Sequence, residues 1–341
     1  MRPHLVSLLA LVLFAGSASG APLDVQAVND AQWQKTPDKS GTSALLIKTQ
    51  VLLDRAHFSP GEIDGKNGDN LKKALTAFAA AQNLEPGDRL TEDLWQKLTA
   101  TSTEPVLTEY AISDDDLRGP FLDKVPTKLE EMKDLPSLGY KRPREKLAEK
   151  FHMSEEVLQA LNPKQKFDNA GERIVVARVS ATKLPERAAR VEIDKTAQVL
   201  KLIARDNRVL ATYPATVGSS ERPAPSGSLK VSRVTRNPTY RYNPKYAFKG
   251  VHATEPFTVK PGPNGPVGLV WIGLSPGEGY GIHGTADPSK VSKSESHGCV
   301  RLTNWDALQV ASVVSKGTPV EFSGDEQLRQ AQNDGRRKRR R

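Results

Sequence analysis

The hydrophobic pattern of the chain changes near residue 187, and this change limits the folds that the sequence can adopt. Before that point, apolar residues recur at the three- or four-residue spacing of amphipathic helices. After it, short β-branched runs separated by turn residues predict an antiparallel, mostly β domain at residues 188–323. Because 341 residues are too many for one small domain, we expect a multidomain protein. The strands expected in the β domain lie at residues 190–194, 198–203, 209–213 and 317–322.

The first 21 residues have the pattern of a secretory signal peptide. Arg2 and His4 precede an apolar run at residues 5–15, and small residues follow it. This run is well short of the roughly 20 apolar residues that a transmembrane helix needs. We therefore expect residues 1–21 to direct export to the periplasm or cell envelope, leaving a mature chain without a transmembrane segment. Residues 22–42 are polar and are expected to form a leader.

Residues 43–100 have the spacing of three short helices joined by a turn-rich loop. The second helix is expected at residues 69–82, and Thr91 occupies the N-cap position of the third. The signature residues are those of the loop at 58–65 with Ala74, Phe78, Leu84, Thr91, Trp95 and Leu98. With these residues the region resembles the peptidoglycan-binding-like domain of cell-wall enzymes. The resemblance implies a small three-helix domain associated with the wall.

Residues 101–139 hold several prolines and an acidic run, and we expect a connector with short ordered pieces there. Residues 140–180 then predict two helices, the second capped by Ser154, and a strand at 173–177. The characteristic positions are Leu147, Ala148, Leu161, Asn162, Pro163 and residues 171–174. This order resembles a LysM-like module of β-α-α-β topology, which implies contact with glycan.

A single cysteine, Cys299, constrains the chemistry of the chain. One cysteine excludes an intrachain disulfide, and an exported thiol meets an oxidising environment. An unpaired cysteine there is either a reactive nucleophile or a buried, inert side chain.

The residues around Cys299 favour the reactive alternative. His283, His297 and Arg301 lie within twenty residues of it, in a turn-rich part of the chain. An imidazole that takes the thiol proton makes cysteine a useful nucleophile. Gly298 permits a strained turn that aims the N–H groups of Gly298 and Cys299 at a developing oxyanion.

Two other interpretations of these residues remain open. His283, His297 and Cys299 supply three metal ligands, which is too few for a structural zinc site but enough for a catalytic one. The same residues are also compatible with packed or solvated side chains that have no chemical role.

The sequence around the thiol carries a family resemblance. The pattern runs His283-Gly284-Thr285 and then Ser296-His297-Gly298-Cys299-Val300-Arg301-Leu302. Further matching stretches lie at residues 216–218, 224–227, 237–240 and 262–268. Together they resemble the L,D-transpeptidase (YkuD-like) catalytic domain, and the likeness extends over residues 188–323. Ala224 departs from the threonine that is usual there. The resemblance implies a YkuD-like β-sandwich.

Roles for individual residues follow from that resemblance. Cys299 would be the nucleophile and His283 the general base, oriented by the backbone carbonyl of Gly284. Arg301 would hold a substrate carboxylate through its planar fork, unless it forms a structural ion pair. Ser296 would hydrogen-bond within the motif, and His297 would shape the site. No metal or other cofactor is implied.

The resemblance also implies a function in cell-wall remodelling. The enzyme would release the terminal D-Ala of a peptidoglycan tetrapeptide stem, form a thioester and transfer the acyl group to an amine. The same scaffold would alternatively act as an L,D-carboxypeptidase or endopeptidase, or anchor a lipoprotein. A non-catalytic peptidoglycan-binding protein is the alternative from a different class. The expected partners are stem peptides and, through the N-terminal modules, glycan.

The C-terminal stretch at residues 324–341 is expected to be a disordered basic tail. Its last six residues carry six of the nine net positive charges. Like charges repel and bury little surface. For an exported chain an anionic envelope surface is a better expected partner than nucleic acid, and a merely solvated tail is the alternative.

Overall fold

The computed structural model describes eight stretches of the chain: residues 23–34, 42–179, 183–219, 222–246, 251–277, 279–294, 296 and 298–324. The expected signal peptide, residues 325–341 of the expected basic tail and His297 lie outside the described residues. Among the helices of the described part, none combines the length and apolar character needed to cross a membrane.

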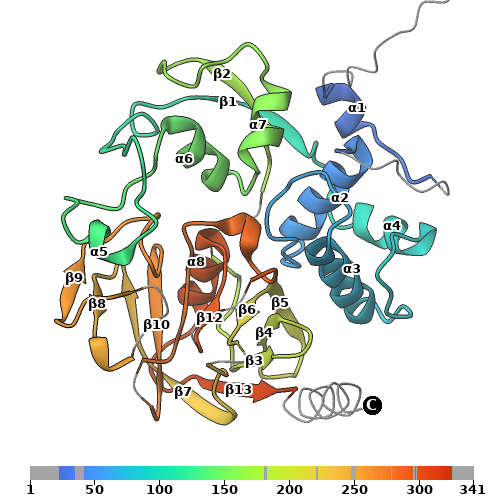
Figure 1. The fold of residues 1–341 in the computed structure, drawn as a ribbon. Helices are drawn as coiled ribbons and strands as arrows, with labels where there is room; N and C mark the ends of the chain where they lie inside the picture. The colour runs from blue at the N-terminus through green and yellow to red at the C-terminus, as the bar shows by residue number, and fades with distance from the viewer. Residues whose placement is uncertain are drawn as a thin grey trace, which may run out of the picture.

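Helices dominate the N-terminal region. They are α1 (Val25–Asn29), α2 (Ala44–Arg55), α3 (Asp69–Ala81) and α4 (Glu92–Thr99), drawn in blue and teal in Figure 1. Ser43 caps α2, and Thr91 caps α4 by accepting a hydrogen bond from the N–H of Leu94 at 3.3 Å. Helix α1 falls in the stretch expected to be a polar leader, and Val28 is fully buried in it. Leu23 and Val25 pack against the same core, so several apolar contacts hold this turn.

A two-stranded sheet and three helices follow. The elements are β1 (Leu107–Ala111), α5 (Leu129–Met132), α6 (Pro143–Lys150), α7 (Glu155–Leu161) and β2 (Arg173–Ala177). Strand β1 lies in the stretch expected to be a connector, where it pairs antiparallel with β2. Only Leu107 of the five strand residues is fully buried, so the strand has no clear two-residue alternation and gives a weak pattern in the sequence. One hydrophobic core extends from Val28 to Ala177, so these elements share it with the preceding helices.

The C-terminal region contains a nine-stranded sheet of order β5-β4-β3-β13-β7-β10-β11-β12-β6. Its strands are β3 (Arg190–Asp194), β4 (Val199–Ile203), β5 (Val209–Pro214), β6 (Thr216–Val217), β7 (Gly227–Arg236), β10 (Val270–Ser275), β11 (Gly281–His283), β12 (Val300–Arg301) and β13 (Pro319–Ser323). Strands β8 (Tyr240–Tyr242) and β9 (Phe257–Val259) pair separately. Short 3₁₀ turns lie at Pro244–Tyr246 and Pro288–Lys290, and helix α8 spans Asn304–Val313.

This sheet differs from the expected antiparallel β-sandwich in two ways. Strand β13 is parallel to β3, and β11 is parallel to β12. The nine strands also form one hydrogen-bonded sheet, because the ten-residue strand β7 pairs with β13 at its start and with β10 along the rest. A register shift at Gly273 and Leu274 interrupts the β7–β10 ladder, as a bulge does where a sheet bends.

Helix α8 was not expected from the sequence. Figure 1 shows it against the sheet and below α6. Most of its residues are buried, including Trp305, Asp306 and Gln309, so it has no polar face to give a helical period. Its N-cap, Thr303, accepts a hydrogen bond from the N–H of Asp306 at 3.2 Å.

The loop at residues 58–65 connects the N-terminal helices to two other parts of the fold, the β domain and the segment after α6. The N–H of Ser59 donates to the carbonyl of Thr212 on β5 at 2.8 Å, and the N–H of Thr212 donates to His57 at 2.9 Å. The N–H of Ile63 donates to the carbonyl of His152 at 2.8 Å. These backbone hydrogen bonds fix the helical region to the β domain and to the end of α6.

A buried polar contact joins α6 to α8. The Asn304 amide nitrogen donates to the two carboxyl oxygens of Glu149 at 3.1 and 3.0 Å, and the Tyr140 hydroxyl donates to the same carboxyl at 3.2 Å. The side-chain amide oxygen of Asn304 accepts from the N–H of Leu269 at 3.1 Å. Burial raises the pKa of Glu149 to about 8, although these donors oppose the shift.

This raised pKa makes the stability of the chain depend on pH. Between the ordinary carboxyl value of 4.5 and about 8, the folded protein holds a proton on Glu149 that the unfolded chain has lost. We predict that folding stability falls as pH rises through this window, by at most about 1.4 kcal/mol per pH unit for one proton. Glu149→Gln, which stays neutral, removes that contribution. The melting temperature measured from pH 5 to 8.5 tests this.

The exposed Glu85 provides the control, since Glu85→Gln leaves the wild-type pH dependence unchanged. Melting curves of wild type and Glu149→Gln that stay parallel across the whole range would contradict the prediction.

Candidate active site

Strand pairing gathers three of the expected site residues. In the parallel ladder of β11 and β12, Ile282 lies beside Val300 and His283 beside Arg301. Successive side chains in a strand point to opposite faces. Ile282 and Val300 are buried in the core, so His283 and Arg301 share the other face, and Cys299 lies two residues before Arg301 on that side.

These three side chains line one cavity of about 1070 Å³. Ser296 and Gly298 of the motif line it as well. Strands β7, β8 and β10 contribute further walls, and a residue of α5 adds another. The remaining described lining residues are Leu129, Arg222, Pro223, Arg233, Thr235, Asn237, Pro238, Thr239, Tyr240, Arg241, Val251, Pro266, Val267, Trp271, Gly279 and Tyr280.

The imidazole of His283 is fixed in position and in tautomer. Its Nδ1 lies 2.7 Å from the carbonyl oxygen of Gly284. A carbonyl only accepts, so Nδ1 carries the hydrogen and the Nε2 lone pair remains available to take a proton. The ring also stacks on Trp271, its neighbour across the β10–β11 pairing, with centroids 5.7 Å apart. Burial and the charge of Arg301 lower the pKa of His283 to about 4, so the ring is neutral at neutral pH.

Cys299 is half-buried and its thiol is protonated in the resting structure. The sulfur lies 3.4 Å from the carbonyl oxygen of Gly279, to which the S–H donates. Burial raises the pKa of Cys299 to about 11, and this effect exceeds the opposing influence of the Gly281 backbone and Arg301. The site therefore holds a neutral thiol and a neutral imidazole.

The turn before Cys299 requires glycine. Gly298 has a φ of +92°, a conformation that residues with a Cβ rarely adopt. The Ser296 hydroxyl donates to the Cys299 carbonyl at 2.6 Å, and the Ser296 N–H donates to Gly218 at 3.0 Å. These two hydrogen bonds of Ser296 hold the turn against the end of β6.

Arg301 is half-buried at the cavity wall. Within the described part of the chain it forms no ion pair with a carboxylate, so the structural ion pair considered from the sequence is not found there. Burial lowers the pKa of the guanidinium, and Cys299 and Asp287 partly offset that effect. A charged fork that faces a cavity in this way is suited to a carboxylate ligand.

Sequence reasoning assigned no role to several cavity residues. Trp271, Arg233, Arg241 and Leu129 carry no local signal, because only the pairing of distant strands and the path of the chain bring them to the cavity. Tyr240 lay in a stretch used for the family resemblance, and burial together with Cys299 raises its pKa to about 12. In the described residues, no cluster of three or more His, Cys, Asp or Glu side chains is arranged to hold a metal ion.

Comparison with known proteins identifies the class to which this fold and site belong. The L,D-transpeptidase (YkuD) catalytic domain matches residues 188–322. Since a relative that is 31% identical is matched over 92% of its own length, the chain belongs to the L,D-transpeptidase family. This confirms the resemblance seen in the sequence of the β domain.

Three relatives show the extent of the similarity. YkuD of Bacillus licheniformis, named as an L,D-transpeptidase, is 31% identical over 182 residues, covering 52% of this chain and 92% of its own. YqjB of Bacillus subtilis is 30% identical over 139 residues, covering 40% and 71% of the two chains. YbiS of Escherichia coli is 30% identical over 136 residues, covering 39% and 44%.

The raised thiol pKa predicts how Cys299 reacts with a small electrophile. We expect the rate of alkylation by iodoacetamide to rise about tenfold per pH unit from pH 7 to 10, without a plateau near neutrality, because only the thiolate reacts. Arg301→Gln shifts the profile to higher pH, since the cation lowers the thiol pKa. Mass spectrometry at timed intervals measures the rate on the only thiol of the chain.

Arg301→Lys, which keeps the charge, serves as the matched control and retains most of the wild-type profile. A rate that is already constant between pH 6 and 8 would show a thiolate–imidazolium pair and refute the prediction.

Proposed function

We propose that this chain is a peptidoglycan L,D-transpeptidase with Cys299 as nucleophile and His283 as general base and then acid. The observation that carries the proposal is the presence of the thiol, the tautomer-fixed imidazole and the guanidinium of Arg301 in one cavity. Family membership supports the reaction class.

The first half-reaction forms an acyl-enzyme. The sulfur of Cys299 attacks the carbonyl carbon of the third stem residue while the thiol proton moves to Nε2 of His283. The carbon–sulfur bond forms, the bond to the terminal D-Ala nitrogen breaks, and His283 returns the proton to that leaving amine. Because the resting thiol is protonated, its proton must move to His283 for the sulfur to become an effective nucleophile.

Two further elements of the site support this step. The N–H groups of Gly298 and Cys299 are proposed as donors for the oxyanion of the tetrahedral intermediate, which the positive φ of Gly298 supports. The guanidinium of Arg301 holds a carboxylate of the stem peptide through two parallel hydrogen bonds. His297 is proposed to shape the site, as its position in the motif implies.

The second half-reaction depends on the acceptor. A side-chain amine of another stem gives a cross-link between two third residues, a lipoprotein lysine gives an anchored lipoprotein, and a free D-amino acid gives exchange. Water gives carboxypeptidase or endopeptidase activity. We propose the amine of a second stem as the main acceptor.

The remaining regions are proposed to bring the enzyme to its substrate. Residues 1–21 direct export to the periplasm, and residues 43–100 and 140–180 act as wall-binding modules. The helices α2, α3 and α4, and the pairing of β1 with β2 around α6 and α7, are compatible with these roles. The basic stretch at 324–341 is proposed to contact anionic envelope surface.

The reaction is tested with a disaccharide-tetrapeptide and mass spectrometry. We expect the mature chain to release one D-Ala and to form either an acyl adduct or a cross-linked dimer. Cys299→Ala abolishes both products, and His283→Ala lowers the rate about 10²- to 10⁴-fold, as expected for loss of a general base. A folded wild-type protein with a titratable thiol but without adduct or product would instead favour a non-catalytic wall-binding protein.

Substrate recognition by Arg301 is tested separately. Arg301→Lys keeps the positive charge but loses the two parallel hydrogen bonds to a carboxylate. We predict about a tenfold fall in kcat/KM for the tetrapeptide, seen mainly in KM, from steady-state D-Ala release. Arg236→Lys, at the exposed last residue of β7, is the matched control and has wild-type kinetics. An unchanged KM in Arg301→Lys would remove this residue from substrate binding.

A further inference from the structure

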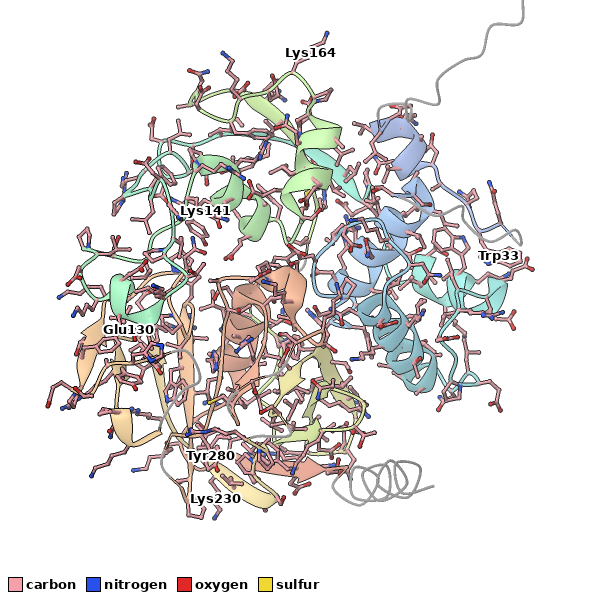
Figure 2. All side chains as sticks on the ribbon, viewed as in Figure 1. Trp33, Glu130, Lys141, Lys164, Lys230 and Tyr280 are labelled. Atoms are coloured by element: carbon pink, nitrogen blue, oxygen red, sulfur yellow. The ribbon has the colours of Figure 1, made fainter. Side chains whose placement is uncertain are left out.

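The segment between β1 and α6 lies against the catalytic domain, although it precedes the family match by about fifty residues. Figure 1 shows α5 beside β8 and β9, and Figure 2 shows Glu130 on α5 at this side of the sheet. The contacts on both sides of Leu129 determine what this segment does.

One anchor lies where the segment approaches α6. The N–H of Leu138 donates to the carbonyl of Pro261 at 3.0 Å, and the N–H of Asn264 donates to the carbonyl of Leu138 at 2.9 Å. The Asn264 amide nitrogen donates to Gly139 at 2.9 Å. At Gly262, which has a φ of +155°, a Cβ would lie 2.1 Å from the Leu138 oxygen. The backbones therefore approach each other too closely for any side chain at this position.

The second anchor is made by α5 itself. A carboxyl oxygen of Glu130 accepts a hydrogen bond from the backbone N–H of His252 at 2.6 Å. This bond joins α5 to the chain that leads into β9. Leu129 and Val251, the neighbours of these two residues, both line the cavity that contains Cys299.

The two residues give the cavity a particular chemistry. Leu129 and Val251 are aliphatic, whereas Arg222, Arg233, Arg241 and Arg301 line other parts of the same cavity. Among the described lining residues there is no carboxylate. A ligand that combines carboxylates with aliphatic carbon matches this lining, and a tetrapeptide stem has both.

We propose that Leu129 contacts the aliphatic part of the bound acyl donor and is a specificity-determining residue supplied from outside the catalytic domain. Glu130 is a positioning residue that holds α5 at the cavity wall. The proposal rests on the proposed function, since it assigns the donor to a tetrapeptide stem. It also means that the catalytic domain alone lacks part of its substrate site.

The test compares steady-state D-Ala release from the tetrapeptide by full-length variants. Leu129→Ala raises KM about three- to tenfold and leaves kcat within about twofold, because a contact made equally in the ground and transition states affects KM alone. Leu129→Met, which restores the bulk, returns KM to near the wild-type value. Lys133→Ala, at an exposed position just after α5, is the matched control.

Further measurements separate the outcomes. Equal alkylation rates of Cys299 show that the site is intact in each variant. If titration of the Cys299 thiol shows that Leu129→Ala does not fold, Leu129→Gln is measured in its place. The same three- to tenfold rise in KM is expected for it. A KM equal to that of the wild type, or a loss confined to kcat, overturns the proposal.

If the wild-type chain releases no D-Ala, the proposed function is refuted. The proposal about Leu129 is then tested by a binding measurement. The affinity of the tetrapeptide for Cys299→Ala is then compared with that for Cys299→Ala combined with Leu129→Ala, by calorimetry. Equal affinities overturn the proposal, and a three- to tenfold weaker complex supports it.

Discussion

The parallel pairing of β11 with β12 is the constraint on which the site depends. Only two residue pairs form it, yet it fixes which side chains face the core and which face the cavity. With Ile282 and Val300 buried in the core, a shift of one residue in either strand would turn the imidazole or the guanidinium inward. The burial of the two aliphatic side chains therefore specifies the register, and the register specifies the position of the functional groups.

The site also depends on regions outside the catalytic domain. Asn304, at the start of α8, contacts Glu149 of α6 and the backbone near β10. A buried carboxyl is costly unless it is protonated or well bonded, and Glu149 is both stabilised by donors and raised in pKa. The docking of α6 on the β domain thus includes a specific polar contact, and it places the segment containing α5 against the cavity.

The sequence could predict the parts of this site that are local in the chain. Cys299, Ser296, Gly298 and Arg301 lie within one short motif, so their proximity needs no knowledge of the sheet. Trp271 could not be assigned, because its contact with His283 arises only from the pairing of β10 with β11. Helix α8 was not predicted because burial on all sides removes the helical period of apolar and polar residues. Strand β1 was not predicted because five residues in a proline-rich stretch carry little pattern. The parallel pairs were missed because strand direction follows from long connections and not from the strand residues themselves.

The protonation state of the site follows from burial acting on two groups of opposite charge type. Removing water disfavours the thiolate of Cys299 and the imidazolium of His283 alike, so the pKa of the thiol rises while that of the imidazole falls. Arg301 lowers both values, which stabilises the thiolate but destabilises the imidazolium beside it. Transfer of the proton to form an ion pair is therefore unfavourable in the resting site. It becomes favourable when the sulfur bonds to a carbonyl carbon, since the negative charge then leaves the sulfur for the substrate oxygen. A site with this balance of pKa values keeps the thiol protonated until a carbonyl is in place.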